Sequence, residues 1–219
     1  MIPIGDDNTN RRTFPVVNYA LIAINVIVFL IELSQPDPQA YIVRWGAVPA
    51  RITAGQDLVT LVTSTFLHAG WWHLLGNMLF LYVFGDNVED AFGHVRYLLF
   101  YLVCGVLAGL GQVILAPQAE LPGVGASGAI SGVLAAYLLM FGTNPVRVII
   151  GIFPAVVPAY LMIGVWIVLQ FLNGIASFVQ TAQTGGVAYG AHVGGFVGGL
   201  VLALVLRPAR SRGLPRRYR

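Results

Sequence analysis

Long apolar stretches, separated by short polar connections, run through almost the whole chain. A helix of about 20 apolar residues spans the hydrocarbon core of a bilayer. Six stretches approach that length, and we expect helices over Val16–Leu33, Trp71–Gly85, Tyr97–Leu115, from Ser127 to just before Asn144-Pro145, Arg147–Leu172 and Val187–Leu206. The pattern therefore predicts an all-α polytopic membrane protein in which six transmembrane helices form one bundle.

Two of the predicted helices and two connections are irregular. Trp71–Gly85 would be about 22 Å long, which is shorter than the ~30 Å hydrocarbon core. The fifth helix carries Pro154 and Pro158, so we expect it to be kinked. The long connection over residues 34–70 is expected to form short helices at the membrane surface. A polar, Gly-rich connection over residues 180–186 joins the last two helices.

The composition agrees with a membrane protein. Hydrophobic residues make up 57% of the 219 residues, charged residues only 10%, and the mean hydropathy is +0.78. A water-soluble domain of this size carries more charge. The net charge of +3 comes from arginines in the loops and at the ends of the chain, so we expect the lipid bilayer as the partner surface and no nucleic acid.

The arginines predict the orientation of the helices. With the N-terminus inside, ten of the twelve arginines lie on the inner side, and only Arg44 and Arg51 lie outside. Cytoplasmic segments carry such an excess. We therefore expect a multi-pass protein with a polar cytoplasmic N-terminus (1–13), a membrane domain (14–206) and an Arg-rich cytoplasmic tail (207–219) that touches anionic lipid. We expect its membrane to be the plasma membrane of a bacterium or archaeon.

Four polar residues lie at a similar shallow depth in three helices that all run from outside to inside. These are His73 and Asn77 in the second helix, Ser127 in the fourth and His192 in the sixth. Ionisable groups inside a membrane are costly and usually face an interior cavity. Each residue alone has an ordinary explanation as an interhelical hydrogen-bonding group, but their common depth favours a functional site.

A serine hydroxyl becomes a nucleophile when an imidazole removes its proton. No acidic residue lies at this depth in the three helices, so the pattern predicts a dyad of Ser127 and His192 without a carboxylate. The side chains of His73 and Asn77, and the backbone N–H of Ser127, could hold a developing oxyanion. A zinc site with His68 is the competing hypothesis, but no Cys or carboxylate completes the ligand set.

Glycines flank both members of the expected dyad. Gly125 and Gly128 leave room for a substrate backbone beside the serine. Gly195 and Gly199, opposite Gly128 and Gly132, allow the two helices to approach closely enough for a Ser–His hydrogen bond. We therefore expect Gly125, Gly128 and Gly195 to shape the substrate groove and the helix contact.

These residues form motifs of a known family. The motifs are His68-x4-His73-x3-Asn77, Gly125-Ala126-Ser127-Gly128, Ala191-His192-x2-Gly195 and, more weakly, Phe84-Gly85 followed by Glu89. Over residues 14–206 the chain resembles the rhomboid intramembrane serine proteases.

The resemblance implies that Ser127 is the nucleophile and His192 the base, with His73 and Asn77 supporting the oxyanion. It further implies transmembrane protein substrates, cleavage near the outer membrane boundary, and no cofactor or metal. His68 matches a family histidine that is thought to be structural. Glu89 matches a family residue that ties the inner end of the second helix to its neighbours.

Three positions depart from the family pattern. Val59-Thr60 replaces a Trp-Arg pair, and Ser131 replaces an aromatic residue that stacks on the base. Gly190 replaces a bulky residue, and Tyr189 could support the ring instead. A catalytically silent rhomboid-like protein that binds membrane helices is therefore an alternative. A small transporter is a third, although no inverted repeat is visible.

Overall fold

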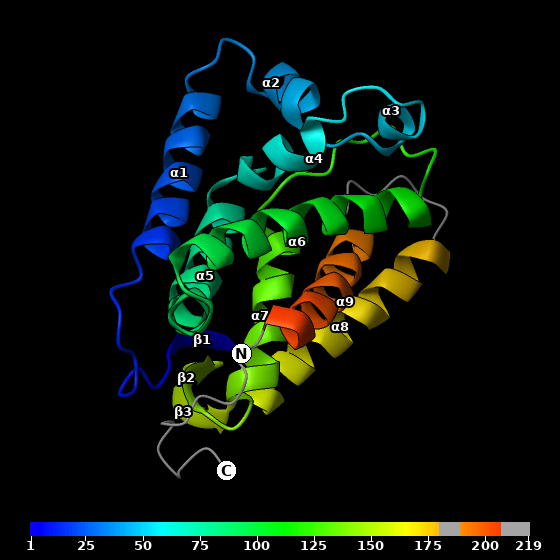
Figure 1. Cartoon of the computed structure of the whole chain (residues 1–219). Helices are drawn as coiled ribbons and strands as arrows, with labels where there is room; N and C mark the ends of the chain where they lie inside the picture. Colours follow the sequence, from blue (N-terminus) through cyan, green and yellow to red (C-terminus); the bar gives the residue numbers. More distant parts are fainter. Residues whose placement is uncertain (180–188, 207–219) are drawn as a thin grey trace.

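A computed structural model of the chain describes residues 1–179 and 189–206, and helices make up most of it (Figure 1). The helices are α1 (Val16–Leu33), α2 (Pro38–Trp45), α3 (Pro49–Thr53), α4 (Thr60–Thr63), α5 (Trp71–Phe92), α6 (His94–Leu115), α7 (Ser127–Phe141), α8 (Ala159–Val179) and α9 (Tyr189–Leu206). The strands are β1 (Ile2–Gly5), β2 (Pro145–Ile150) and β3 (Phe153–Pro158). The connection over residues 180–186, the first two residues of the predicted sixth helix and the 207–219 tail lie outside the described residues.

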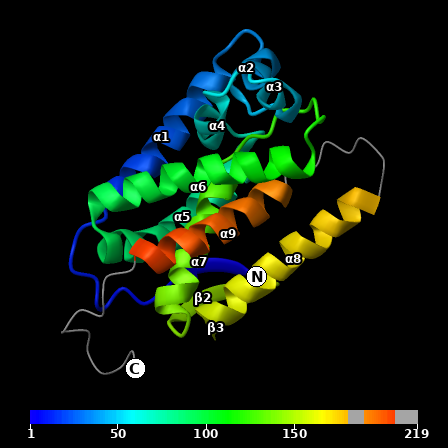
Figure 2. The ribbon, with the colours of Figure 1, turned by 45° about the vertical axis from the view of Figure 1, so that its right-hand side comes forward.

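Helix α7 is the centre of the bundle. Its ten consecutive residues Gly128–Tyr137 are all buried, because α5, α6 and α9 pack around them. Small side chains along α7 and α9 bring these two helices close together. Helix α8 runs along the outer side of α9, as the turned view shows (Figure 2). The buried core therefore surrounds the helix that begins with Ser127.

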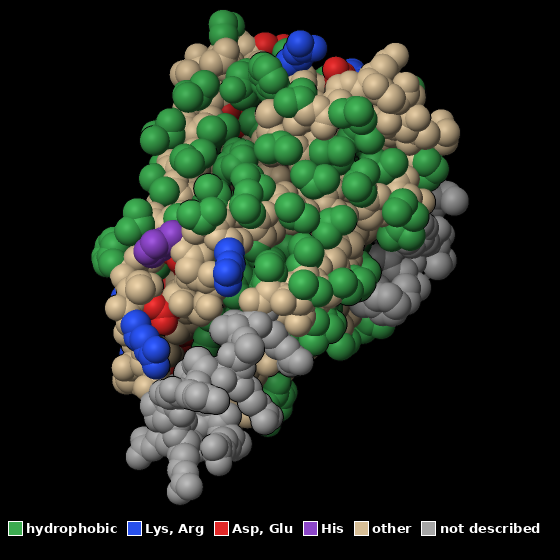
Figure 3. Space-filling view, viewed as in Figure 1, with side chains coloured by type: hydrophobic (Ala, Val, Ile, Leu, Met, Phe, Trp, Pro, Cys, Tyr) green, Lys and Arg blue, Asp and Glu red, His purple; other side chains and the backbone are tan. Residues whose placement is uncertain are grey.

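Within residues 1–179 and 189–206, three helices are both long and apolar enough to cross a membrane: α1, α6 and α9. Helices α7 and α8 are also apolar, over shorter described lengths. Hydrophobic side chains cover most of the face over α1 and α6, and charged side chains gather toward its two ends (Figure 3). The fold is thus a helical membrane bundle, and the count of six spans stays a prediction.

Helix α1 has the predicted bounds, and α2 to α4 confirm that residues 34–70 contain short helices. The predicted end of the second helix at Gly85 is wrong. Helix α5 continues to Phe92 and has 22 residues, or about 33 Å, so it is long enough to cross the hydrocarbon core. Helix α6 begins at His94 rather than at Tyr97.

The extra turns of α5 carry acidic side chains whose partners come from the N-terminal segment. Arg11 Nη1 lies 2.6 Å from Asp86 Oδ2. Glu89 is fully buried and accepts the backbone N–H groups of Val17 (3.0 Å) and Asn18 (2.7 Å). These N–H groups belong to the first turn of α1, where no intrahelical acceptor exists. The polar residues therefore continue the helix instead of ending it.

The predicted kinked helix over Arg147–Leu172 is wrong in its first part, because residues 145–158 form the β2–β3 hairpin. The turn is at Gly151, whose φ of +64° suits glycine. Both strands are rich in β-branched residues, which favour strands. Pro154 and Pro158 lie in β3, an edge strand of the sheet, where a missing N–H is tolerated. Helix α8 begins only at Ala159.

The N-terminal residues complete this sheet. Strand β1 pairs antiparallel with β2, with Ile2 opposite Ile149, which gives the order β1-β2-β3. Next to the strand, the carboxylate of Asp6 is buried and accepts hydrogen bonds from Tyr137 Oη (2.6 Å) and Asn87 Nδ2 (2.5 Å). Burial raises the pKa of Asp6 to about 6. Residues near the start of the chain are thus attached to the C-terminal parts of α5 and α7.

Candidate active site

Ser127 is the first residue of α7, and the segment before it is fixed by backbone hydrogen bonds. Gly123 and Ala47 exchange N–H···O bonds of 2.8 and 2.9 Å, and the N–H of Gly125 donates to Ser64 O at 2.9 Å. Gly125 has φ +123°, which a residue with a Cβ rarely adopts. The chain therefore turns sharply into α7 and holds the serine at the helix start.

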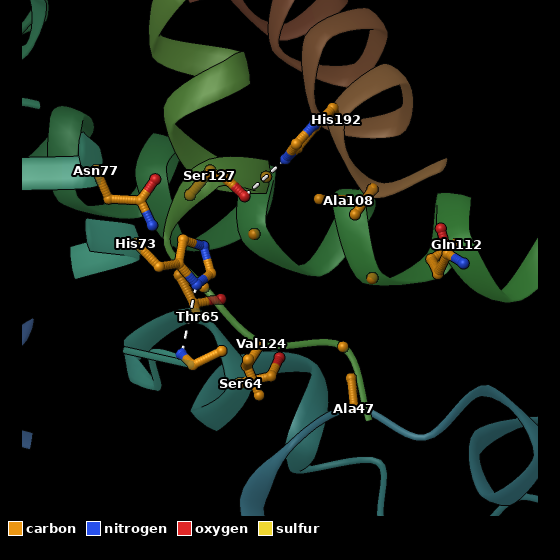
Figure 4. A pocket seen from close by; sticks show the side chains of 18 of the residues that line it. Ala47, Ser64, Thr65, His73, Asn77, Ala108, Gln112, Val124, Ser127 and His192 are labelled. Atoms are coloured by element: carbon orange, nitrogen blue, oxygen red, sulfur yellow. Dashed lines mark hydrogen bonds between the residues drawn. The ribbon is translucent and has the colours of Figure 1, made fainter. Parts of the chain in front are cut away.

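His192 of α9 lies beside this serine. Its Nε2 atom is 2.8 Å from Ser127 Oγ (Figure 4), and only 6% of the residue is exposed. The contact depends on glycines at the helix interface. A Cβ on Gly195 would overlap the carbonyl oxygen of Gly128, and a Cβ on Gly199 would overlap Gly132. The close approach predicted from these glycines is present, although Gly128 also packs against Ala108 of α6.

The other side of the His192 ring contacts α8. Gln170 Oε1 lies 2.7 Å from His192 Nδ1. The Trp166 ring lies 5.7 Å from the imidazole centroid, and the Tyr189 ring meets it edge-on at 6.3 Å. Tyr189, the first residue of α9, thus contacts the ring, which the sequence had left open. Ser131 turns away and donates to Ser127 O at 2.6 Å.

Sequence reasoning missed Gln170 and Trp166. The signal that could have found them is their spacing of four residues, since a polar and an aromatic side chain at i and i+4 share one face of a helix. The predicted helix began too early, in what is a hairpin, and gave no indication of which face of α8 turns toward His192.

His73 and Asn77 of α5 face the serine from the opposite side (Figure 4). His73 Nδ1 accepts the backbone N–H of Ala69 at 3.4 Å, so in the neutral ring the proton lies on Nε2. Asn77 Nδ2 is buried and has no protein partner within the described residues. A Cβ on Gly125 would come within 2.7 Å of His73 Nε2 and 3.5 Å of Asn77 Nδ2. Gly125 therefore keeps open the space in front of two donors.

One cavity of about 950 Å³ is lined by His73, Asn77, Ser127, Trp166, Gln170 and His192. It extends from His73 and Asn77 past Ser127 and His192 to Gln112 of α6. Its size is at the upper end of ordinary ligand pockets. An extended peptide segment could lie in it with a carbonyl group at the serine.

The structure also locates His68, which the competing zinc hypothesis requires. His68 is fully buried and packs edge-on against the rings of His73 (5.1 Å) and Phe29 (6.4 Å). In residues 1–179 and 189–206, no three His, Cys, Asp or Glu side chains gather closely enough to hold a metal ion.

The fold and the site together define a helical membrane protein with a paired serine and histidine facing a cavity. The family model described as the Rhomboid domain matches residues 55–209, which is more than half of the chain. The chain therefore belongs to the rhomboid family and is an integral, multi-pass membrane protein.

Curated relatives come from bacteria, plants and yeast. The chain is 29% identical over 192 residues to the rhomboid protease GluP of Bacillus subtilis, covering 87% of this chain and 35% of GluP. It is 44% identical over 79 residues to Rhomboid-like protein 11, chloroplastic, of Arabidopsis thaliana, covering 36% of this chain and 28% of that protein. It is 31% identical over 188 residues to Rhomboid protein 1, mitochondrial, of Saccharomyces cerevisiae, covering 81% and 49%.

The chain thus spans half or less of the length of each of these relatives. At the level of the family, the matches support intramembrane protease activity on membrane-protein substrates. Several relatives carry only rhomboid-like names, so the activity of this chain has to be argued from its own residues.

Proposed function

We propose that the chain is an intramembrane serine endopeptidase that hydrolyses peptide bonds in or near the transmembrane segments of membrane-protein substrates. One observation carries the proposal: His192 Nε2 lies 2.8 Å from Ser127 Oγ in a cavity that Asn77 also lines, and Asn77 Nδ2 is a buried donor with no partner within the described residues. A base within hydrogen-bond reach is the first requirement for activating a serine. A silent, binding-only member would have no need of this contact.

In the proposed reaction, Ser127 Oγ attacks the substrate carbonyl carbon while His192 takes its proton. The oxyanion of the tetrahedral intermediate receives hydrogen bonds from Asn77 Nδ2, His73 Nε2–H and the backbone N–H of Ser127, which has no acceptor within α7. Loss of one such donor typically costs about 10²–10³ in rate. His192 then gives its proton to the leaving amine, and a water molecule hydrolyses the acyl-enzyme by the same path in reverse. Gly125 leaves the substrate room to reach these donors.

The arginine distribution supports a cytoplasmic location of both termini. With that orientation the start of α7, and so the dyad, lies toward the outer side of the membrane. The substrates would then be cut close to the outer ends of their transmembrane segments, in the plasma membrane of a bacterium or archaeon. No step in this reaction needs a cofactor or a metal ion.

The test is cleavage of a transmembrane substrate by the purified chain in detergent and in liposomes, with and without EDTA. We expect the wild type to cleave the substrate in detergent and in liposomes, whether or not EDTA is present. We expect no cleavage by Ser127→Ala. Ser131→Ala is the matched control, because Ser131 lies one turn further along α7 and its hydroxyl bonds only to the helix backbone. Unchanged cleavage by Ser127→Ala would overturn the proposal. A wild type that neither cleaves nor reacts with a fluorophosphonate probe would favour the silent binder.

A further inference from the structure

The hydrogen bond on the far side of the His192 ring decides which ring nitrogen can act as a base. A neutral imidazole carries one proton, and the nitrogen that bears it cannot accept another. Gln170 presents its amide oxygen to Nδ1 at 2.7 Å. This oxygen has only lone pairs to offer, so it holds the proton on Nδ1 and leaves Nε2 free toward Ser127 Oγ.

We propose that Gln170 is the positioning residue of the dyad: it fixes the tautomer and the orientation of His192 in which Nε2 can accept the serine proton. The proposal rests on the proposed protease function. In serine proteases with a triad, a carboxylate has this task. Here a neutral amide performs it, and it comes from α8, a different helix from those that carry the serine and the histidine.

The surroundings of the ring leave this task to α8. His192 makes two side-chain hydrogen bonds within the described residues, one to Ser127 and one to Gln170. Helix α7 gives the ring no stacking partner one turn after the serine, because Ser131 bonds to its own helix. Trp166, four residues before Gln170, packs against the ring at 5.7 Å. One face of α8 therefore supplies both a hydrogen bond and an aromatic contact.

This arrangement makes the dyad sensitive to the position of α8. The helix is anchored at its first turns, where Ala159, Met162 and Ile163 are buried. Further along, Val165, Val168 and Leu169 are exposed, so this part of the helix is held on one side only. Displacement of its second half from α9 would break the contact between Gln170 and His192. The base is thus oriented only while α8 lies against the bundle.

The experiment compares Gln170→Met, Gln170→Glu and the control Leu169→Ala. Methionine keeps the length and volume of the side chain but has no comparable acceptor, whereas glutamate keeps an acceptor oxygen. Leu169 lies on the same helix and points outward, 51% exposed. The measurements are kcat and KM for a transmembrane substrate and the rate of labelling of Ser127 by a fluorophosphonate.

We expect Gln170→Met to lower kcat and the labelling rate about 10- to 100-fold, a modest share of what general base catalysis supplies, with KM changed less than about threefold. Gln170→Glu and Leu169→Ala should both stay within about fivefold of the wild type. A packing role alone would leave the methionine variant active. The proposal would be overturned if Gln170→Met were labelled at the wild-type rate. It would also be overturned if the methionine and glutamate variants lost kcat to the same extent.

A second measurement needs no change at Gln170. The ¹⁵N spectrum of histidine-labelled protein, with the His192 signals assigned by their loss in His192→Gln, should show the proton on Nδ1. A proton on Nε2 would overturn the proposal even if the variants fail to fold. If the wild type neither cleaves the substrate nor is labelled by the fluorophosphonate, the proposed protease function is wrong. The position of the His192 proton in the ¹⁵N spectrum still tests the role of Gln170.

Discussion

Replacing Gly195 by alanine tests whether the glycine contact between α7 and α9 sets the geometry of the dyad. The new Cβ would overlap the carbonyl oxygen of Gly128 and lie 3.3 Å from the Cβ of Ala108. The carbonyl is part of the backbone of α7 and cannot rotate away. Helix α9 therefore has to shift by about 1 Å to restore an ordinary contact, and overpacking of this kind costs about 1–3 kcal/mol of stability.

The shift acts directly on catalysis, because His192 is less than one turn from Gly195 on the same helix. Added to the present 2.8 Å between Nε2 and Oγ, a displacement of about 1 Å removes the hydrogen bond, and a misplacement of that size costs about 100-fold in rate. The assay is the rate of fluorophosphonate labelling of Ser127, with the thermal unfolding midpoint measured in parallel. Labelling at the wild-type rate in folded Gly195→Ala would refute the reasoning.

The matched control is Gly164→Ala on α8. A Cβ at Gly164 meets no atom within 4 Å, and alanine favours a helix over glycine by about 1 kcal/mol. We expect this variant to label at the wild-type rate and to be equally or more stable. A loss of activity there would mean that any added methyl group in the bundle is harmful, and that the effect at Gly195 is not specific.

Two other predictions concern the oxyanion donor and the N-terminal carboxylate. Asn77→Ala should lower kcat about 10²–10³-fold with little change in KM, since the oxyanion exists only after attack; a raised KM with kcat intact would contradict this. The pKa of Asp6 is about 6 when folded against an ordinary 3.8, a difference of about 3 kcal/mol. This contribution to stability is complete below pH 3.8 and is lost as the pH rises through about 6. In Asp6→Asn the thermal unfolding midpoint should therefore change less with pH between about pH 4 and 7 than in the wild type. An unchanged pH dependence would show that another group causes it.

Local signals in the sequence were enough for much of the bundle. Helix α1 is a single apolar run between a proline and a polar segment, and its bounds are the predicted ones. Ser127, His73, Asn77 and His192 were grouped because their helices run in the same direction, and the structure brings all four to one cavity. Their depth could be compared because the distribution of the arginines predicts which side of the membrane each loop faces.

Contacts between distant parts of the chain were out of reach of the same reasoning. Residues 145–158 are apolar in either conformation, and what makes them strands includes pairing with Ile2–Gly5, far away in sequence. The acidic residues after Gly85 resemble the end of a helix because important partners of Asp86 and Glu89, Arg11 and the backbone N–H of Val17, lie far away in the sequence. Gln170 was invisible for a related reason, since its meaning depends on which face of α8 turns toward His192.

Because β1 pairs with β2, the sheet can form only late in the synthesis of the chain. Ile2–Gly5 leave the ribosome long before their partner strand, which is not complete until Ile150, and β3 ends only at Pro158. At about 5–20 residues per second, about 150 residues take about 8–30 s to make. Through that interval Asp6 remains in water with its charge unburied, and the first strand has no edge to join. Strand β1 can thus join the sheet only after four of the described long helices, α1, α5, α6 and α7, have been synthesised.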